Sequence, residues 1–208
     1  MKKKEKTKVA KYLANELNLA HHGVLAYRVV SHNGFKCIVG ILVDTISFKP
    51  EGFRLYFFAQ CMFIPVEFYD LSTGALDYIQ GTLDDITDAD FIEKIRSTYQ
   101  KYAKINTLND IISNIEKHII PYAGGECCKW ELFAYIYLVI GDIDKSMIYL
   151  DKFISYQIEE NAKWNITEPI KDKAIKELIL NGSIDETYKT LKDWQLRTIN
   201  ALKLTDVI

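Results

Sequence analysis

The tripeptide His32-Asn33-Gly34 constrains this chain more than any other local feature, because it separates two stretches that are typical of β-strands. Asn-Gly readily takes the positive φ angles that a two-residue type I′ turn requires, and such turns join antiparallel strands. Residues 24–31 form the first predicted strand. Residues 35–43 are apolar on both faces of the second, so we expect that strand to be central and covered on both sides.

Further strands and a helix extend this hairpin into a predicted meander sheet. Lys49-Pro50-Glu51-Gly52 is typical of a turn, and residues 53–64 form a third strand that ends near Pro65, because proline lacks a ladder donor. Residues 76–80 allow a short fourth strand. Before the hairpin, apolar residues at helical spacing predict an amphipathic helix that ends at Gly23 and packs on one face of the sheet.

The second half of the chain has helical signals throughout. Capping arrangements at Thr87 and Thr107 predict helices over residues 88–104 and 108–120. We therefore predict an α+β fold: an N-terminal helix packed on an antiparallel three- to four-stranded meander sheet, followed by an all-helical C-terminal half of helical hairpins. The expected domains are 1–106 for the sheet and 107–208 for the helices, either separate or sharing one core.

A short internal similarity supports the helical hairpins. The segment that begins Gly141-Asp142 recurs 41 residues later as the segment that begins Gly182-Ser183. Each glycine is expected to end one helix, and the polar residue after it to cap the next. Two copies are too few for a free-standing solenoid.

Composition favours a cytoplasmic globular protein. Hydrophobic residues make up 49% of the chain and charged residues 26%, and no apolar run approaches the roughly 20 residues that span a bilayer. The basic N-terminus is not followed by the apolar stretch of a signal peptide. Four cysteines without the spacing of a disulfide framework or a zinc site are interpreted as reduced thiols.

Charge is distributed unevenly along the chain. Only four arginines accompany the many lysines and the net charge is −2, which argues against a nucleic-acid-binding surface. No lysine or arginine lies between Arg54 and Lys94. That interval contains eight carboxylates: Glu67, Asp70, Asp77, Asp84, Asp85, Asp88, Asp90 and Glu93.

The acidic interval is the basis of the functional hypothesis. Its negative potential suits a basic protein partner, and Asp77, Asp84, Asp85 and Asp88 are the expected partner-binding residues. The competing interpretation is structural, since aspartates are common in loops and at helix starts, and folding can bring lysines alongside. The leading hypothesis is a non-enzymatic interaction protein. The sequence leaves its oligomeric state open.

An alternative is a small-molecule-binding or thiol-dependent enzymatic domain with its pocket between the sheet and the helical half. Cys127 and Cys128 lie where a helix N-terminus can lower the pKa of a thiol, and His118 could approach them. No nucleotide-binding, hydrolase or metal-binding motif is present, so neither a cofactor nor a metal is expected. The interpretation leans away from an enzyme.

The order of helix, Gly23, hairpin with Tyr27-Arg28-Val29-Val30, central strand and Phe63-Ile64-Pro65 resembles uncharacterised small bacterial α+β domains over residues 7–104. Several such domains are immunity proteins of polymorphic toxin systems, so this resemblance implies a toxin-neutralising role. The C-terminal hairpins are similar to tetratricopeptide-type helical pairs, although their 41-residue spacing and incomplete residue pattern depart from that repeat.

Overall fold

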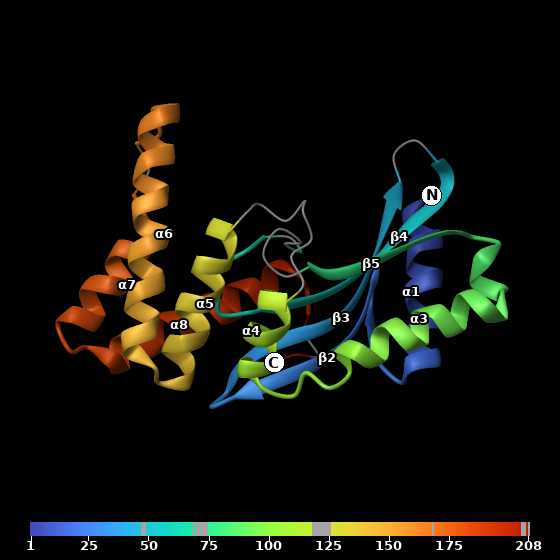
Figure 1. The fold of residues 1–208 in the computed structure, drawn as a ribbon, viewed down its shortest axis with the longest axis horizontal. Coiled ribbons are helices and arrows are strands. Elements are labelled where there is room, and N and C mark those ends of the chain that lie inside the picture. The colour runs from blue at the N-terminus through green and yellow to red at the C-terminus, as the bar shows by residue number, and fades with distance from the viewer. Residues whose placement is uncertain are drawn as a thin grey trace. The chain divides into compact units, whose positions relative to one another are not determined.

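The computed structural model describes residues 1–46, 49–67, 69, 75–117, 126–167, 169–204 and 207, without the side chains of residues 49, 50, 126 and 128. It confirms the α+β fold with a helical C-terminal half (Figure 1). The chain forms two compact units. The first comprises Met1–Ser31, Cys37–Gln60 and Gly74–Ile120, and the second comprises His32–Lys36, Cys61–Thr73 and Pro121–Ile208.

The sheet has five strands in the order β1-β2-β3-β4-β5 and is antiparallel. Their bounds are Ala20–His22, Leu25–His32, Phe35–Ile46, Lys49–Cys61 and Ala75–Thr82. The order makes β3 the central strand, as predicted. The predicted fourth strand is β5, whereas β1 was missed: it pairs with β2 in a three-residue register that its two histidines do not suggest.

Positive φ angles define the turns at both ends of β2. Asn33 and Gly34 have φ values of 49° and 75°, which confirms the predicted hairpin turn. Gly23 does not end the first helix, contrary to expectation. That helix, α1 (Lys3–Leu17), ends at Asn18, whose φ of 53° lets the N–H of Leu19 donate to the carbonyl of Ala14. Gly23 lies in the β1–β2 turn instead.

Both ends of β4 differ from the sequence-based prediction. Residues 49–52 are not a turn but the beginning of β4, where Gly52 pairs with Thr82 of β5. Pairing along β5 therefore outweighs the local turn preference, and proline is tolerated near the start of a strand. At its other end β4 stops at Cys61, four residues before Pro65, because the N–H of Ile64 turns back to the carbonyl of Cys61.

Helices pack on this sheet in the first unit. Val9 and Leu13 of α1 are buried, and Lys6 of the same helix pairs with Asp44 of β3. The ring of Phe91, on α3 (Ala89–Tyr102), meets Phe53 edge-on at 6.1 Å between centroids. The helix α4 (Leu108–Lys117) follows, with its isoleucines buried.

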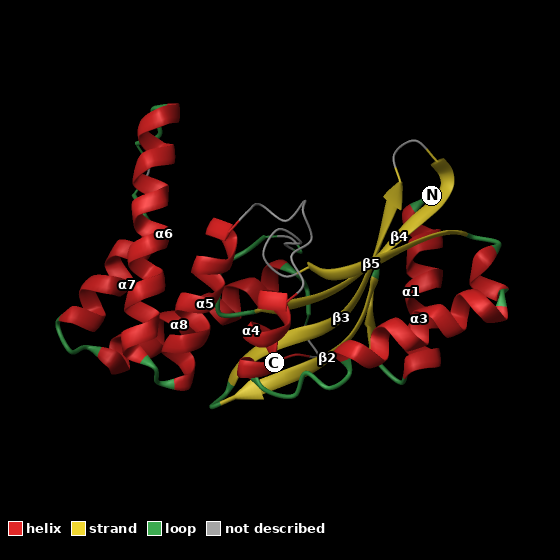
Figure 2. Ribbon diagram, viewed as in Figure 1, coloured by secondary structure: helices red, strands yellow, loops and turns green. Residues whose placement is uncertain are grey.

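Helices α5 (Glu126–Ile140), α6 (Ile143–Trp164), α7 (Lys171–Leu180) and α8 (Ile184–Ala201) make up most of the second unit (Figure 2). Residues 132–136 of α5 are buried in succession, as expected for a helix that is apolar all round. None of the helices in the described part of the chain is both long and apolar enough to cross a bilayer.

The two predicted glycine turns have the same geometry. Gly141 and Gly182 have φ values of 88° and 73°. In each turn the N–H of the residue after the glycine donates to the carbonyl of the residue five positions earlier. Asp142 donates to Tyr137 and Ser183 donates to Leu178, both at 2.9 Å. The capping prediction is correct only in part, since the Asp142 side chain accepts from Lys145 while the Ser183 side chain makes no cap hydrogen bond.

Polar side chains of α8 stabilise irregular backbone within the second unit. The Gln195 amide donates to the carbonyl of Gly34 at 3.0 Å and accepts from the N–H of Lys36 at 2.7 Å, which holds the hairpin turn. The hydroxyl of Thr198 donates to the carbonyl of Ile64. The helix thus satisfies backbone groups that the sheet leaves unpaired.

Gly40→Ala should destabilise the first unit strongly, because a Cβ at residue 40 would lie 2.1 Å from the carbonyl oxygen of Ala26 in β2. We expect a loss of about 3 kcal/mol in the free energy of unfolding, measured by urea denaturation. Gly23→Ala is the control, since its Cβ meets nothing and only the positive φ is unfavourable, at about 1 kcal/mol. Equal losses would contradict the close approach of β2 and β3.

Candidate functional site

From Asp77 onward the acidic interval runs along β5, through the short 3₁₀ helix η1 (Asp85–Thr87) and into α3. Asp84, Asp85 and Asp88 come together around η1 and the start of α3. Asp77 does not join them, since it lies on β5 roughly 17 Å along the strand from Thr82. Asp70 is outside the described residues, and Glu67 belongs to the other unit.

Asp85 and Asp88 hold local backbone in place. Asp85 accepts from the N–H of Thr82 at 2.7 Å and from its hydroxyl at 2.9 Å, and these donors lower the pKa of the carboxyl below its ordinary value. Asp88 is the N-cap of α3 and accepts from the N–H of Phe91 at 2.8 Å. Asp85 and Asp88 therefore make the local hydrogen bonds that the structural interpretation expects of aspartates in a loop and at a helix start.

Both carboxylate oxygens of Asp77 accept hydrogen bonds. One accepts from the N–H of Tyr78 at 2.8 Å, and the other accepts from the hydroxyl of Tyr102 at 3.2 Å. Burial raises the pKa of the Tyr102 hydroxyl, and the nearby charge of Asp77 raises it further. Asp77 thus links β5 to the end of α3.

Asp84 and Asp90 differ from these three. Both side chains are exposed, and neither makes a hydrogen bond or ion pair with any residue that the structure describes. Glu93 is also exposed but pairs with Arg96 at 3.7 Å. Asp84 before η1 and Asp90 in the first turn of α3 are consequently the carboxylates of this region that are most available to another molecule.

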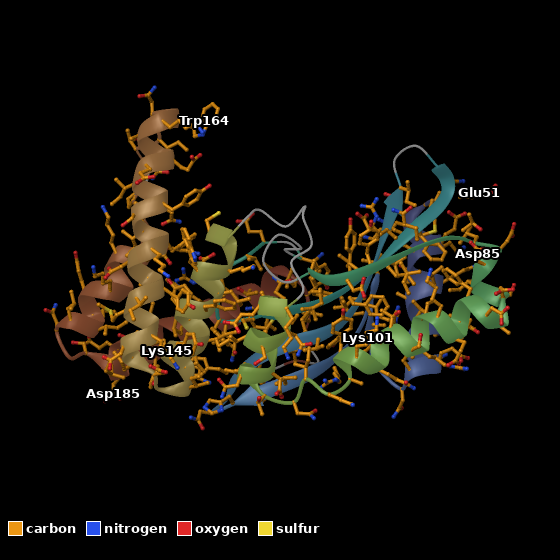
Figure 3. All side chains as sticks on the ribbon, viewed as in Figure 1. Glu51, Asp85, Lys101, Lys145, Trp164 and Asp185 are labelled. Atoms are coloured by element: carbon orange, nitrogen blue, oxygen red, sulfur yellow. The ribbon has the colours of Figure 1, made fainter. Side chains whose placement is uncertain are left out.

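The sheet register adds one acidic residue that sequence analysis missed. Gly52 pairs with Thr82, so exposed Glu51 lies at the end of the sheet where η1 begins, and Figure 3 shows Glu51 and Asp85 at that same end. More than thirty residues separate Glu51 from Asp84 in the sequence. Only the β4–β5 pairing could have revealed that they are neighbours. We call Glu51, Asp84, Asp85, Asp88 and Asp90 the acidic surface.

A groove of about 420 Å³ adjoins the acidic surface. Its apolar walls are Val9 and Tyr12 of α1 with Leu83 and Ile86 of the η1 loop. Lys8 also lines it, so folding does bring one lysine alongside the acidic residues. The acidic surface is therefore bounded by the lysine-rich α1 and does not extend across the whole unit.

The alternative thiol site is described only in part. Cys127 lies half-buried in the first turn of α5, whereas His118 and the side chain of Cys128 are outside the described residues. Cys37 and Cys61 are buried, and none of the cysteines at positions 37, 61 and 127 is in a disulfide. Within the described residues, no three His, Cys, Asp or Glu side chains are placed to share a metal ion. The thiol alternative stays a prediction.

The second unit contains a buried carboxylate that sequence analysis did not single out. Asp172 of α7 is fully buried, and one of its oxygens accepts from the hydroxyl of buried Tyr135 at 2.5 Å. Its other oxygen has no hydrogen-bond partner among the described residues. Burial raises the pKa of Asp172 above its ordinary value, and burial also raises that of Tyr135. Beside this pair, Lys171 and Glu131 form an ion pair at 2.7 Å.

Asp172→Asn should make the protein more stable at pH 7, by on the order of 1 kcal/mol, because the amide keeps the acceptor for Tyr135 and removes a buried charge. An aspartate whose pKa is raised by folding stabilises most at low pH, and that contribution is lost as pH rises through the folded-state pKa. The variant should therefore lose less stability than the wild type between pH 4 and pH 7.

The matched variant Tyr135→Phe removes the donor and should lower the free energy of unfolding by about 1–3 kcal/mol. Denaturant titrations at several pH values check both variants. An Asp172→Asn protein that is less stable than the wild type at every pH would contradict the assignment of a costly buried charge.

Comparison of the chain with protein-family models, with curated proteins and with solved structures found no match.

Proposed function

We propose that this chain is a non-enzymatic interaction protein that binds a basic protein partner through its acidic surface. The observation that carries the proposal is that the side chains of Asp84 and Asp90 are exposed and make no hydrogen bond or ion pair with another described residue. Their neighbours Asp85 and Asp88 are bonded to the backbone, which fixes the loop on which Asp84 lies. Exposed carboxylates on a loop that is held in this way support electrostatic recognition, because little ordering is required when the partner binds.

The chemistry favours a protein as the partner. A surface of carboxylates repels phosphate, so nucleic acid is a poor ligand for it. Lysine and arginine side chains on a folded partner could pair with Asp84 and Asp90, while their aliphatic stems contact the apolar groove beside Leu83 and Ile86. Exposed ion pairs of this kind contribute mainly to association rate and specificity, and salt weakens them.

Within this class we propose the role of a bacterial, cytoplasmic, toxin-neutralising immunity protein. Support comes from the resemblance of residues 7–104 to such domains and from the acidic surface, which suits a basic toxin. The hairpins α5–α6 and α7–α8, with their matching glycine turns, are proposed to be a tetratricopeptide-like pair.

The test uses the tagged full-length protein and extracts of its native cells, at low and at moderate salt, with captured proteins identified by mass spectrometry. We expect one stoichiometric basic protein that is lost as salt rises. Asp84→Asn with Asp90→Asn should reduce its capture roughly tenfold, since each exposed pair contributes up to about 1 kcal/mol.

The matched control is Asp185→Asn with Glu186→Gln, which removes the same charge from exposed positions on α8. Capture by this control should equal capture by the wild type. If the Asp84/Asp90 variant captures as much as the wild type, or if both variants lose the partner equally, the acidic surface is not the binding site.

A further inference from the structure

Among the strands that the structure describes, β5 lies at the edge of the sheet, with β4 on one side and no strand on the other. Backbone groups of an edge strand that point outward can pair with a strand of another molecule. In an antiparallel pair the outward groups belong to alternate residues. On β5 these are the even-numbered residues, because the N–H groups of Tyr78 and Thr82 bond to side chains and so point away from β4.

Side chains of the chain itself occupy most of this edge. Asp77 accepts from the N–H of Tyr78, and Asp85 accepts from the N–H of Thr82. At the start of the strand, the hydroxyl of Tyr102 donates to the carbonyl of Leu76 at 3.4 Å. Two aspartates of the acidic interval and one tyrosine thus take the positions that an added strand would need.

Gln80 lies between the two occupied N–H groups. By the same alternation its N–H and C=O point outward, and neither bonds to another described residue outside the sheet. Tyr78 and Gln80 are both exposed, so solvent reaches this part of the edge. Gln80 is therefore open to pairing, whereas the N–H groups of Tyr78 and Thr82 on either side of it are occupied.

We propose that Asp77 and Asp85 close the β5 edge against pairing with β5 of a second copy of this chain. The arrangement is self-complementary: antiparallel pairing centred on Gln80 would set Tyr78 of one copy opposite Thr82 of the other. Such a dimer requires the N–H groups of Tyr78 and Thr82 as donors, and these N–H groups already donate to Asp77 and Asp85. The hydrogen bonds from Tyr78 and Thr82 support this role, and it does not rest on the binding of a basic partner.

The test compares two double variants at matched concentration by size-exclusion chromatography with light scattering. Asp77→Ala with Asp85→Ala removes both acceptors and should raise the molar mass twofold relative to the wild type. Asp77→Asn with Asp85→Asn keeps an acceptor oxygen at each position without the charge, and its mass should stay at the wild-type value. Unchanged mass in the alanine variant, or doubled mass in both variants, would overturn the proposal.

A third change locates the contact. Gln80→Pro removes the outward N–H at the centre of the edge while the β4 partners of residues 79 and 81 keep their bonds. Added to the alanine variant, it should restore the wild-type mass. A persistent dimer would show that the alanine variant associates elsewhere and would overturn the proposal.

Amide hydrogen exchange of the wild type gives a second test if the alanine variant does not fold. The amides of Tyr78 and Thr82 should exchange at least tenfold more slowly than the amide of Gln80, since within the described residues only the first two have an acceptor on the outer side of β5. Equal exchange at the three amides would show that the carboxylates do not occupy the edge.

Discussion

Backbone N–H groups that no carbonyl can reach are the constraint on which this structure depends, because an N–H that is shielded from water and has no acceptor is costly. Aspartates meet that requirement repeatedly. Asp85 accepts at the end of β5 and Asp88 at the start of α3. Asp110 accepts from two backbone N–H groups just before α4, and Asp142 accepts from one at the start of α6. The end of β5 and the starts of α3, α4 and α6 thus lie where a carboxylate is in reach.

This constraint changes the interpretation of the acidic interval. A run of carboxylates without nearby lysines suggests a single binding surface, yet Asp77, Asp85 and Asp88 bond first to the chain's own backbone. Asp84 and Asp90 retain free acceptor capacity among the described residues. The two roles depend on each other, because the bonded aspartates fix the loop that presents the unbonded ones.

Local signals explain which parts of the fold were predictable. The turn at Asn33-Gly34 and the helix ends at Gly141 and Gly182 follow from positive φ angles that few residues adopt. The central position of β3 follows from its two apolar faces. The start of β4 was missed because pairing with β5 outweighs the turn preference of Lys49-Pro50-Glu51-Gly52. Glu51 and the burial of Asp172 depend on distant segments, and an aspartate in the first turn of a helix has the same local signature whether exposed or buried.

The most direct test of the central claim is an NMR titration of the aspartate carboxyls in the folded protein. Hydrogen bonds from backbone N–H groups and side chains lower the pKa of Asp85, Asp110 and Asp142. A carboxyl with a lowered pKa stabilises the fold above its unfolded-state pKa, and this contribution is lost as pH falls through the folded-state value. The account predicts that all three titrate below the ordinary range of aspartate. Ordinary pKa values for the three would contradict the claim that these carboxylates hold the backbone.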